Sequence, residues 1–264
     1  MDWKKELYPA ADEKPLDRLA EGYSNTSIFR KIAFIGDSLS SGEFQTENPD
    51  GTPGYYDMYE YSWGQYIARK NGLTAYNFSK GGMSTKKYIE SFAEDQGFWS
   101  PDLATQAYVI ALGVNDMNHI EEHGTLEDIH PTDPSKNKPT FMGYYAAIIA
   151  RYKAIAPEAK FFLVTRPDND KPYTPEERER KILGVNRVIR ELASYFDNTY
   201  LIDLYTYGPV HDTKFKEHYF LLGHMSPAGY LHMAKVIDSY IDYIIRHNPD
   251  DFRHVGFINT GIPY

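Results

Sequence analysis

The stretch KIAFIGDSLSSGEF, residues 31–44, decides the fold class of this chain. It opens as a short apolar run, which is typical of a buried strand, and then breaks abruptly into Gly36, Asp37 and Ser38. A glycine followed by small polar residues is what a tight strand-to-helix turn requires. The stretch therefore predicts one of two things: a strand end with a helix cap, or a nucleophilic serine raised at the carboxyl end of a parallel strand.

Apolar runs alternate with segments of helical spacing along the rest of the chain. We expect strands at 31–35, 73–78, 107–112, 160–165 and 199–204, and helices at 62–70, 85–94, 140–156, 174–196 and 226–247. Parallel strands need crossover connections that cover the sheet, so this order predicts the α/β class. The expected architecture is a three-layer α/β/α sandwich around a five-stranded parallel sheet, with the uniformly apolar run 107–112 as its central strand.

Length and composition limit the possible classes of protein. A chain of 264 residues suits one domain, 1–264, with a core at about 31–247 and flanking segments 1–30 and 248–264. For the C-terminal stretch DFRHVGFINTGIPY (251–264), two alternatives are open: it wraps the domain or joins a subunit interface. The absence of cysteine excludes disulfides, thiolate metal sites and a cysteine nucleophile. The net charge of -9 argues against nucleic acid or an anionic membrane as partner. With no signal-peptide core near the N-terminus and no long apolar span, we expect a cytoplasmic protein, or a secreted one if a leader was trimmed.

Four polar elements follow predicted strands. They are GDSLS (36–40), NFSKGG (77–82), GVND (113–116) and GHMSP (223–227). The carboxyl ends of parallel strands meet at one edge of an open sheet, where ligands bind. Together these elements supply a hydroxyl, a glycine N–H, a side-chain amide and an imidazole, which are the parts that acyl transfer requires.

In their order and spacing, from Gly36 to Gly229, these blocks resemble the SGNH, or GDSL, hydrolase family, which has a flavodoxin-like sheet. The resemblance implies that Ser38 is the nucleophile and His224 the base of a covalent acyl-enzyme mechanism that uses no cofactor and no metal. The oxyanion hole that it implies consists of the Ser38 and Gly82 backbone N–H groups and the Asn115 amide, with Gly81 as the next candidate.

The chain departs from the family at one position. Most members carry an Asp three residues before the histidine, and here that residue is Leu221. The acid normally holds the imidazole in the correct tautomer, so its loss matters. Three explanations stay open: a backbone carbonyl orients His224 in a Ser–His dyad, Asp212 or Glu217 reaches in from the same loop, or the protein is a weak or inactive binding module on the same scaffold.

Other readings of the motifs are weaker. HIEEH (119–123) matches a zinc-peptidase pattern, but Gly124 follows at once and no third ligand is evident. The α/β-hydrolase elbow G-x-S-x-G is not met, because its fifth position is Ser40. A nucleotide site requires a glycine-rich loop before a helix, which the first turn lacks.

The substrate is indicated only by composition. There are 23 tyrosines, several of them in PGYYDMYEYSW (53–63), and half-wet aromatic rings suit sugar stacking. We therefore expect a serine esterase, an acetylesterase above all, that acts on short-chain esters of carbohydrates. Lipase, lysophospholipase and aryl esterase activities of the same family are the alternatives, and a homo-oligomer formed through the terminal segments is a further expectation.

Overall fold

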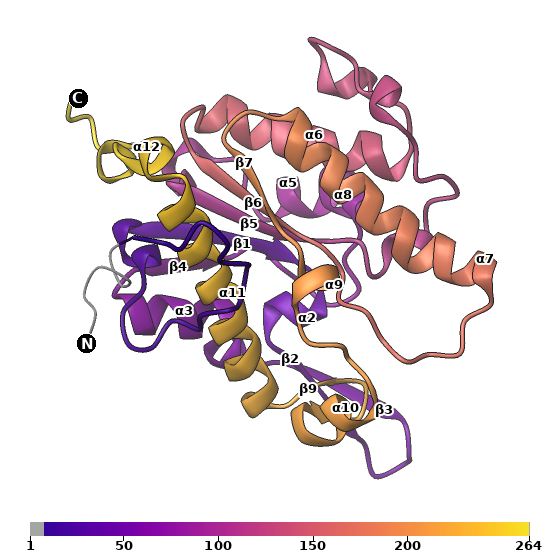
Figure 1. The fold of residues 1–264 in the computed structure, drawn as a ribbon. Helices are drawn as coiled ribbons and strands as arrows, with labels where there is room; N and C mark the ends of the chain where they lie inside the picture. Colours follow the sequence, from indigo (N-terminus) through magenta and orange to yellow (C-terminus); the bar gives the residue numbers. More distant parts are fainter. Residues whose placement is uncertain (1–7, 264) are drawn as a thin grey trace.

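Five parallel strands form the centre of the molecule in the computed structural model, which describes residues 8–263 (Figure 1). The strands are β1 (Lys31–Gly36), β4 (Thr74–Asn77), β5 (Ala107–Ala111), β6 (Lys160–Val164) and β7 (Thr199–Ile202). Their order is β4-β1-β5-β6-β7, and every neighbouring pair is parallel. The predicted five-stranded sheet, with 107–112 as its central strand, is confirmed. The first seven residues of the 1–30 segment and Tyr264 lie outside the described residues.

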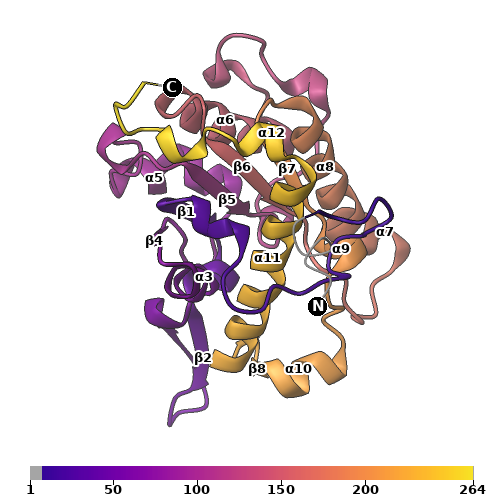
Figure 2. The same ribbon diagram turned by 60° about the vertical axis from the view of Figure 1, so that its left-hand side comes forward.

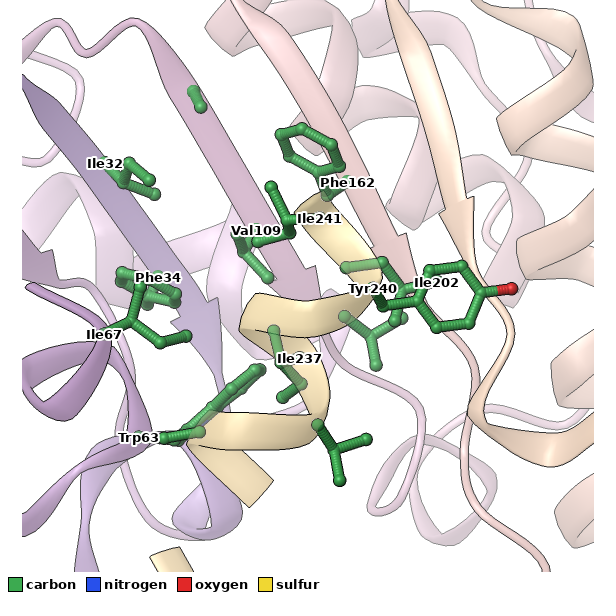
Figure 3. Close-up of a cluster of buried hydrophobic side chains, with 14 of the residues drawn as sticks. Ile32, Phe34, Trp63, Ile67, Val109, Phe162, Ile202, Ile237, Tyr240 and Ile241 are labelled. Atoms are coloured by element: carbon green, nitrogen blue, oxygen red, sulfur yellow. The ribbon is translucent and has the colours of Figure 1, made fainter. Parts of the chain in front are cut away.

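Helices cover both faces of this sheet (Figures 1 and 2). On one face lie α3 (Trp63–Asn71) and α11 (Pro227–His247); on the other lie α6 (Phe141–Ile155) and α8 (Gly184–Tyr195). Side chains of β1 pack against the helices on both faces of the sheet, because successive side chains of a strand point to opposite faces. Ile32 and Phe34 pack toward α3 and α11 (Figure 3), while Ala33 and Ile35 pack into the opposite cluster. The predicted α/β/α sandwich is thus confirmed.

The main helices begin at capping residues that the sequence contains. The Ser226 side chain accepts from the Gly229 N–H at the start of α11. Thr174, which directly precedes Pro175, forms a capping box with Glu177 at the start of the other helix. The predicted helix 174–196 consists of α7 (Pro175–Arg178), the π turn η8 (Glu179–Leu183) and α8. Likewise, 85–94 consists of α4 (Thr85–Lys87), the π turn η3 (Tyr88–Phe92) and α5 (Ala93–Asp95).

Beyond the predicted strands and helices, we expected long loops at 41–61, 117–139 and 205–224, all after strands at the same sheet edge. Two of these segments contain regular structure. Residues 41–61 include an antiparallel hairpin of β2 (Glu43–Glu47) and β3 (Pro53–Asp57). Residues 205–224 include most of α9 (Leu204–Tyr207), α10 (Thr213–Tyr219), β8 (Phe220–Leu221) and the start of β9 (His224–Met225). The loop expectation was wrong because prolines and glycines around the hairpin turn dominate the local sequence signal.

The remaining elements are short. They are α2 (Ser38–Ser41), α12 (Pro249–Phe252) and the 3₁₀ turns η1 (Asn25–Ile28), η2 (Tyr59–Tyr61), η4 (Pro101–Leu103), η5 (Asp116–Asn118), η6 (Leu126–Asp128), η7 (Pro134–Lys136) and η9 (Val255–Phe257). Among the described residues, no helix is both long and apolar enough to cross a bilayer.

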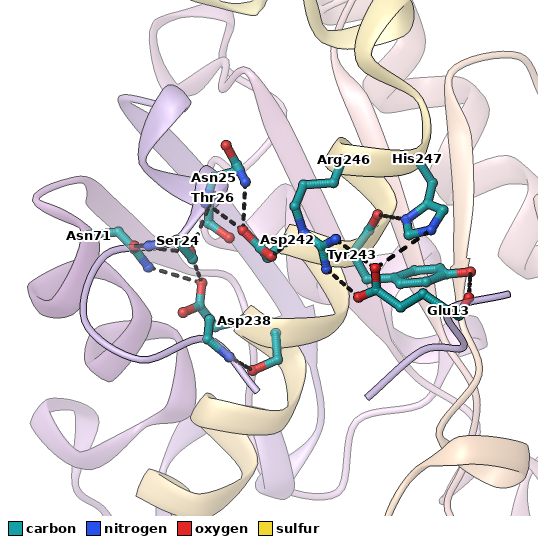
Figure 4. A network of polar contacts seen from close by, with 12 residues as sticks. Glu13, Ser24, Asn25, Thr26, Asn71, Asp238, Asp242, Tyr243, Arg246 and His247 are labelled. Carbon is teal, nitrogen blue, oxygen red and sulfur yellow. Dashed lines mark hydrogen bonds and ion pairs between the residues drawn. The ribbon is translucent and has the colours of Figure 1, made fainter. Parts of the chain in front are cut away.

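The described parts of both flanking segments pack against the core. Near the N-terminus, Ser24 donates to the buried Asp238 of α11 at 2.7 Å, and Glu13 pairs with Arg246 at 2.7 Å (Figure 4). Near the C-terminus, the Val255 carbonyl accepts from Gln106 at 2.9 Å, just before β5 begins. These segments therefore wrap the domain, which for the C-terminal stretch is one of the two sequence-based alternatives, and a homo-oligomer stays a prediction.

Candidate active site

Ser38 lies where β1 ends, at the first position of α2. Its backbone is fixed from two sides: the Asp37 side chain accepts from the Leu39 N–H at 3.0 Å, and the buried Tyr230 hydroxyl donates to the Ser38 carbonyl at 3.0 Å. The strand order reverses between β1 and β5, and open α/β sheets bind ligands at such a switch point. The serine of GDSLS thus occupies the position where this fold places its ligands.

One open pocket of about 470 Å³ brings three predicted site residues together. Ser38, Asn115 and His224 all line it, although they come from segments far apart in the chain. Gly82 lies outside this lining, in the turn after β4, where its φ of 67° is a left-handed conformation that favours glycine. The loop that carries Gly82 is tied to α2, because the Ser79 hydroxyl donates to the Ser40 hydroxyl at 2.9 Å.

Asn115 connects the third block to the first two. Its Nδ2 donates to the Met83 carbonyl at 3.1 Å and makes a long 3.5 Å contact with Asp37 Oδ2. One amide proton therefore fixes the side chain, and the other has only the weaker contact. The next residue, Asp116, is buried and accepts from the backbone and hydroxyl of Thr85 at 2.7 and 2.6 Å.

Asp37 is a buried carboxyl group directly before the serine. The pKa of Asp37 is raised to about 7, mainly by burial and to a smaller extent by the carboxylates of Asp116 and Glu43. The Leu39 hydrogen bond and the Arg166 guanidinium oppose this rise. The hydrogen bonds of Asp37 go to the turn and to Asn115. Asp37 therefore contributes to the site through its contacts with the turn and with Asn115.

His224 contacts two side chains of β2. Its Nδ1 lies 3.2 Å from Gln45 Oε1, and its Nε2 lies 3.2 Å from Glu43 Oε1. The Tyr55 ring packs edge-on against the imidazole, with ring centroids 5.7 Å apart. Among the hydrogen bonds of residues 8–263, none joins Ser38 to His224. The two groups therefore line the same pocket without being hydrogen-bonded to each other. Such a separation is common in enzymes without substrate, because catalytic hydrogen bonds are often long or unformed before substrate binds.

Gln45 determines the tautomer of His224. The same Gln45 oxygen that faces Nδ1 also accepts from the Gly223 N–H at 2.9 Å. Because a backbone N–H can only donate, the side-chain atom at this point must be the amide oxygen and not the nitrogen. An oxygen facing Nδ1 requires a proton on that nitrogen. In the neutral ring, Nε2 is then the free base.

Glu43 shares a proton with His224. Because Nδ1 already carries one, the contact between Nε2 and Glu43 Oε1 is a hydrogen bond only if the carboxyl is protonated or the ring is an imidazolium. Burial raises the pKa of Glu43, as does the nearby Asp57, and burial lowers the pKa of His224. The other Glu43 oxygen packs against Gly81, where an added Cβ would lie 2.0 Å from it.

The two acids suggested by the sequence are placed elsewhere. Asp212 caps α10 by accepting from the Phe215 N–H at 2.8 Å, and Glu217 is exposed on the same helix. The carboxylate that contacts His224 is Glu43. The sequence analysis did not identify the hairpin that pairs residues 43–47 with 53–57. This hairpin makes 43–47 a strand, and residues 43 and 45 of a strand lie on the same face.

The alternative metal motif is engaged in packing. His123 Nε2 lies 2.8 Å from the Arg180 carbonyl, and its ring lies against Gly184 at the start of α8. Within residues 8–263, no group of three His, Cys, Asp or Glu side chains is placed to hold a metal ion.

Several solved structures share the fold. A family two carbohydrate esterase from Clostridium thermocellum, solved with cellohexaose, aligns with a TM-score of 0.54 at 18% identity, covering 92% of this chain and 67% of that chain. A lipase/acylhydrolase from Enterococcus faecalis has a TM-score of 0.51 at 19% identity, with 83% and 96% covered. A carbohydrate acetylesterase from Sinorhizobium meliloti aligns with a TM-score of 0.51 at 14% identity, and the alignment covers 81% of this chain and 99% of that chain. Likenesses at this identity show the fold alone.

Sequence comparison gives the family. None of the curated proteins compared with this chain matches it significantly. The sequence profile of the GDSL-like Lipase/Acylhydrolase family, however, matches residues 34–231, a range that includes Ser38, Asn115 and His224. The chain belongs to the GDSL-like Lipase/Acylhydrolase family, and it is by class a carboxylic ester hydrolase.

Proposed function

We propose that this protein hydrolyses short-chain esters through a covalent intermediate on Ser38. In the first step, Ser38 Oγ attacks the ester carbonyl while His224 Nε2 takes its proton. The Asn115 amide, the Ser38 N–H and the Gly82 N–H stabilise the oxyanion that develops. His224 then protonates the leaving alcohol, and water releases the acyl group from Ser38.

The observation that carries this proposal is the Gln45 contact. A base must present an unprotonated nitrogen, and Gln45 Oε1 holds the proton of His224 on Nδ1, which frees Nε2 for that role. Gln45 thereby performs the orienting part of the acid that Leu221 replaces. In this proposal, the amide takes the place of the backbone carbonyl or displaced acid that the sequence left open.

Before His224 acts as base, its Nε2 must lose the proton that it shares with Glu43 and turn toward Ser38. Loss of that proton leaves a carboxylate oxygen facing the lone pair of Nε2, and these two acceptors repel each other. The proposed active form is therefore the deprotonated pair, so activity rises with pH across the titration of the pair.

The proposed substrates are acetyl esters of carbohydrates. Tyr55, which is 54% exposed, extends from β3 beside His224 and offers a ring face at the site. The pocket that holds Ser38 is lined by several polar side chains, among them Asn169, Lys171 and His211, which suits a sugar better than a long acyl chain. Two proteins of the same fold are a carbohydrate esterase and a carbohydrate acetylesterase, which supports this choice of substrate.

A fluorophosphonate probe tests the mechanism. We expect stoichiometric labelling at Ser38, no labelling and no turnover for Ser38→Ala, and higher kcat/KM for acetyl than for octanoyl esters. The exposed Ser91→Ala on η3 is the matched control and should label like the wild type. Absence of labelling in a folded wild-type protein refutes the mechanism and favours a binding module, while a preference for octanoyl esters refutes the carbohydrate assignment.

A further inference from the structure

The pocket beside Ser38 is cationic, although the chain as a whole carries a net charge of -9. Arg166, Lys171 and Lys216 line it, and no Asp or Glu is among its described lining residues. Lys216 is neutralised by Asp170 at 2.8 Å. Arg166 and Lys171 form no ion pair with a carboxylate among residues 8–263, and the buried Asp37 is near enough to Arg166 for the guanidinium to lower the Asp37 pKa. Two cationic side chains without a direct ion pair therefore remain for a ligand.

Arg166 is held in place without being neutralised. It follows β6 by two positions, and the buried Asn186 side chain both accepts from its N–H at 2.8 Å and donates to its carbonyl at 3.0 Å. Its guanidinium donates to the Lys181 carbonyl at 2.7 Å. Arg178, which lies outside the pocket, instead pairs with the Asp168 carboxylate. A fixed guanidinium with free donors is suited to a planar carboxylate.

His211 has an unsatisfied polar atom beside this pocket. Its side chain also lines the pocket and is only 8% exposed, and its Nε2 is buried without a hydrogen-bond partner among the described residues. The ring is stacked on Phe215, with centroids 4.5 Å apart, so it cannot readily turn to find a partner. Buried polar atoms are nearly always hydrogen-bonded, so this nitrogen needs a partner such as an ordered water next to it.

We propose that this pocket binds a carboxylate carried by the sugar of the substrate, with Arg166 as the principal contact and Lys171 as a further donor. The preferred substrates are then acetylated acidic carbohydrates, such as O-acetylated uronic acids. This inference rests on the proposed esterase function and narrows its substrate. Arg166 is a specificity-determining residue in this assignment and takes no part in the bond-breaking steps.

A matched pair of substrates tests the inference. Methyl 3-O-acetyl-glucuronoside and methyl 3-O-acetyl-glucoside differ at C6, where one carries the carboxylate. We expect kcat/KM to be at least about 10-fold higher for the acid, and Arg166→Gln to lower that value by about 10- to 100-fold, mostly through KM. The same variant should change kcat/KM for the glucoside by less than about 3-fold. Arg166→Lys keeps the positive charge but lacks the paired N–H donors of the guanidinium. Its kcat/KM for the glucuronoside should lie between those of the wild type and Arg166→Gln.

The control variant is Arg151→Gln, which removes an exposed arginine that pairs with Glu94 on a remote surface. It should leave the preference unchanged. Equal kcat/KM values for the acid and the glucoside, or equal losses of both in Arg166→Gln, overturn the inference while the esterase function stands.

Two further measurements separate the possible failures. A higher kcat/KM for 4-nitrophenyl hemisuccinate than for 4-nitrophenyl butyrate, without a preference for the glucuronoside, places the carboxylate on the acyl side and overturns the assignment to the sugar. Failure of the fluorophosphonate to label Ser38 refutes the proposed function itself. In that case, stabilisation of the wild type but not of Arg166→Gln by glucuronate in a thermal shift assay still supports the carboxylate site, and its absence overturns it.

Discussion

Replacing Gln45 with leucine tests how His224 is oriented. The change keeps the approximate size of the side chain and removes the oxygen that faces both His224 Nδ1 at 3.2 Å and the Gly223 N–H at 2.9 Å. The imidazole then loses the contact that holds its proton on Nδ1, and the tautomer with the proton on Nε2, which cannot act as base, becomes populated.

The expected magnitude follows from the two lost hydrogen bonds. Neutral hydrogen bonds contribute about 1 kcal/mol each, so removing both is worth about 2 kcal/mol. If the loss falls wholly on the transition state, kcat/KM falls by about 30-fold. This is far less than the loss of about four orders of magnitude when a charged triad aspartate is replaced in the serine protease example, because Gln45 carries no charge.

The assay is kcat/KM for 4-nitrophenyl acetate as a function of pH, with thermal unfolding measured in parallel. Glu47→Gln, an exposed substitution on the same strand, is the matched control and should leave the rate unchanged. Gln45→Glu is the informative companion, because a carboxylate facing Nδ1 stabilises the imidazolium and should move the acidic limb of the profile to higher pH. A folded Gln45→Leu variant with less than a 3-fold loss and an unshifted profile refutes the orienting role.

Three other predictions follow from the contacts of the site. Asn115→Ala should lower kcat by about 10²- to 10³-fold with little change in KM, measured by steady-state kinetics, if Asn115 is an oxyanion donor. Because burial lowers the pKa of His224, the acidic limb of kcat/KM should lie below pH 6.5, and Glu43→Ala should move it lower still; a shift upward contradicts the shared proton. Asp37 stabilises the fold when protonated, an effect present below its unfolded pKa of 3.8 and lost as pH rises through about 7. Between pH 5 and pH 8, the free energy of unfolding of the wild type, measured with denaturant, should therefore fall by roughly 2–3 kcal/mol relative to that of Asp37→Asn. If the free energies of the two proteins change in parallel with pH, this prediction is wrong.

The parts of the fold that the sequence predicted are those governed by local patterns. The apolar run 107–112 indicated a strand buried on both faces and became the central strand β5, and Ser226-Pro227 indicated the start of α11. Both signals depend on neighbouring residues alone. The placement of Ser38 and Asn115 at the same edge of the sheet was also predictable, because parallel strands have their carboxyl ends at one edge.

The contacts of His224 were not predictable because they depend on non-local pairing. The segment 41–61 contains Pro49, Gly51 and Pro53, which indicate turns, and nothing local reveals that Glu43 pairs with Asp57 across a hairpin. Contact between β2 and residue 224 joins positions about 180 apart in sequence. The search for a displaced acid therefore stayed in the loop nearest the histidine, at Asp212 and Glu217, while the contacting carboxylate lies on β2.

A triad aspartate performs two tasks, and in the proposed mechanism these tasks fall to two residues of one strand. The aspartate holds the tautomer and stabilises the imidazolium. Gln45 can do only the first, because an amide has no charge, and Glu43 has the charge but faces Nε2 instead of Nδ1. Side chains two apart in a strand share a face, so β2 delivers both groups to one ring. The consequence is that Glu43 stabilises the protonated ring while it competes with Ser38 for the same nitrogen, which makes the reaction dependent on turning His224 between the two.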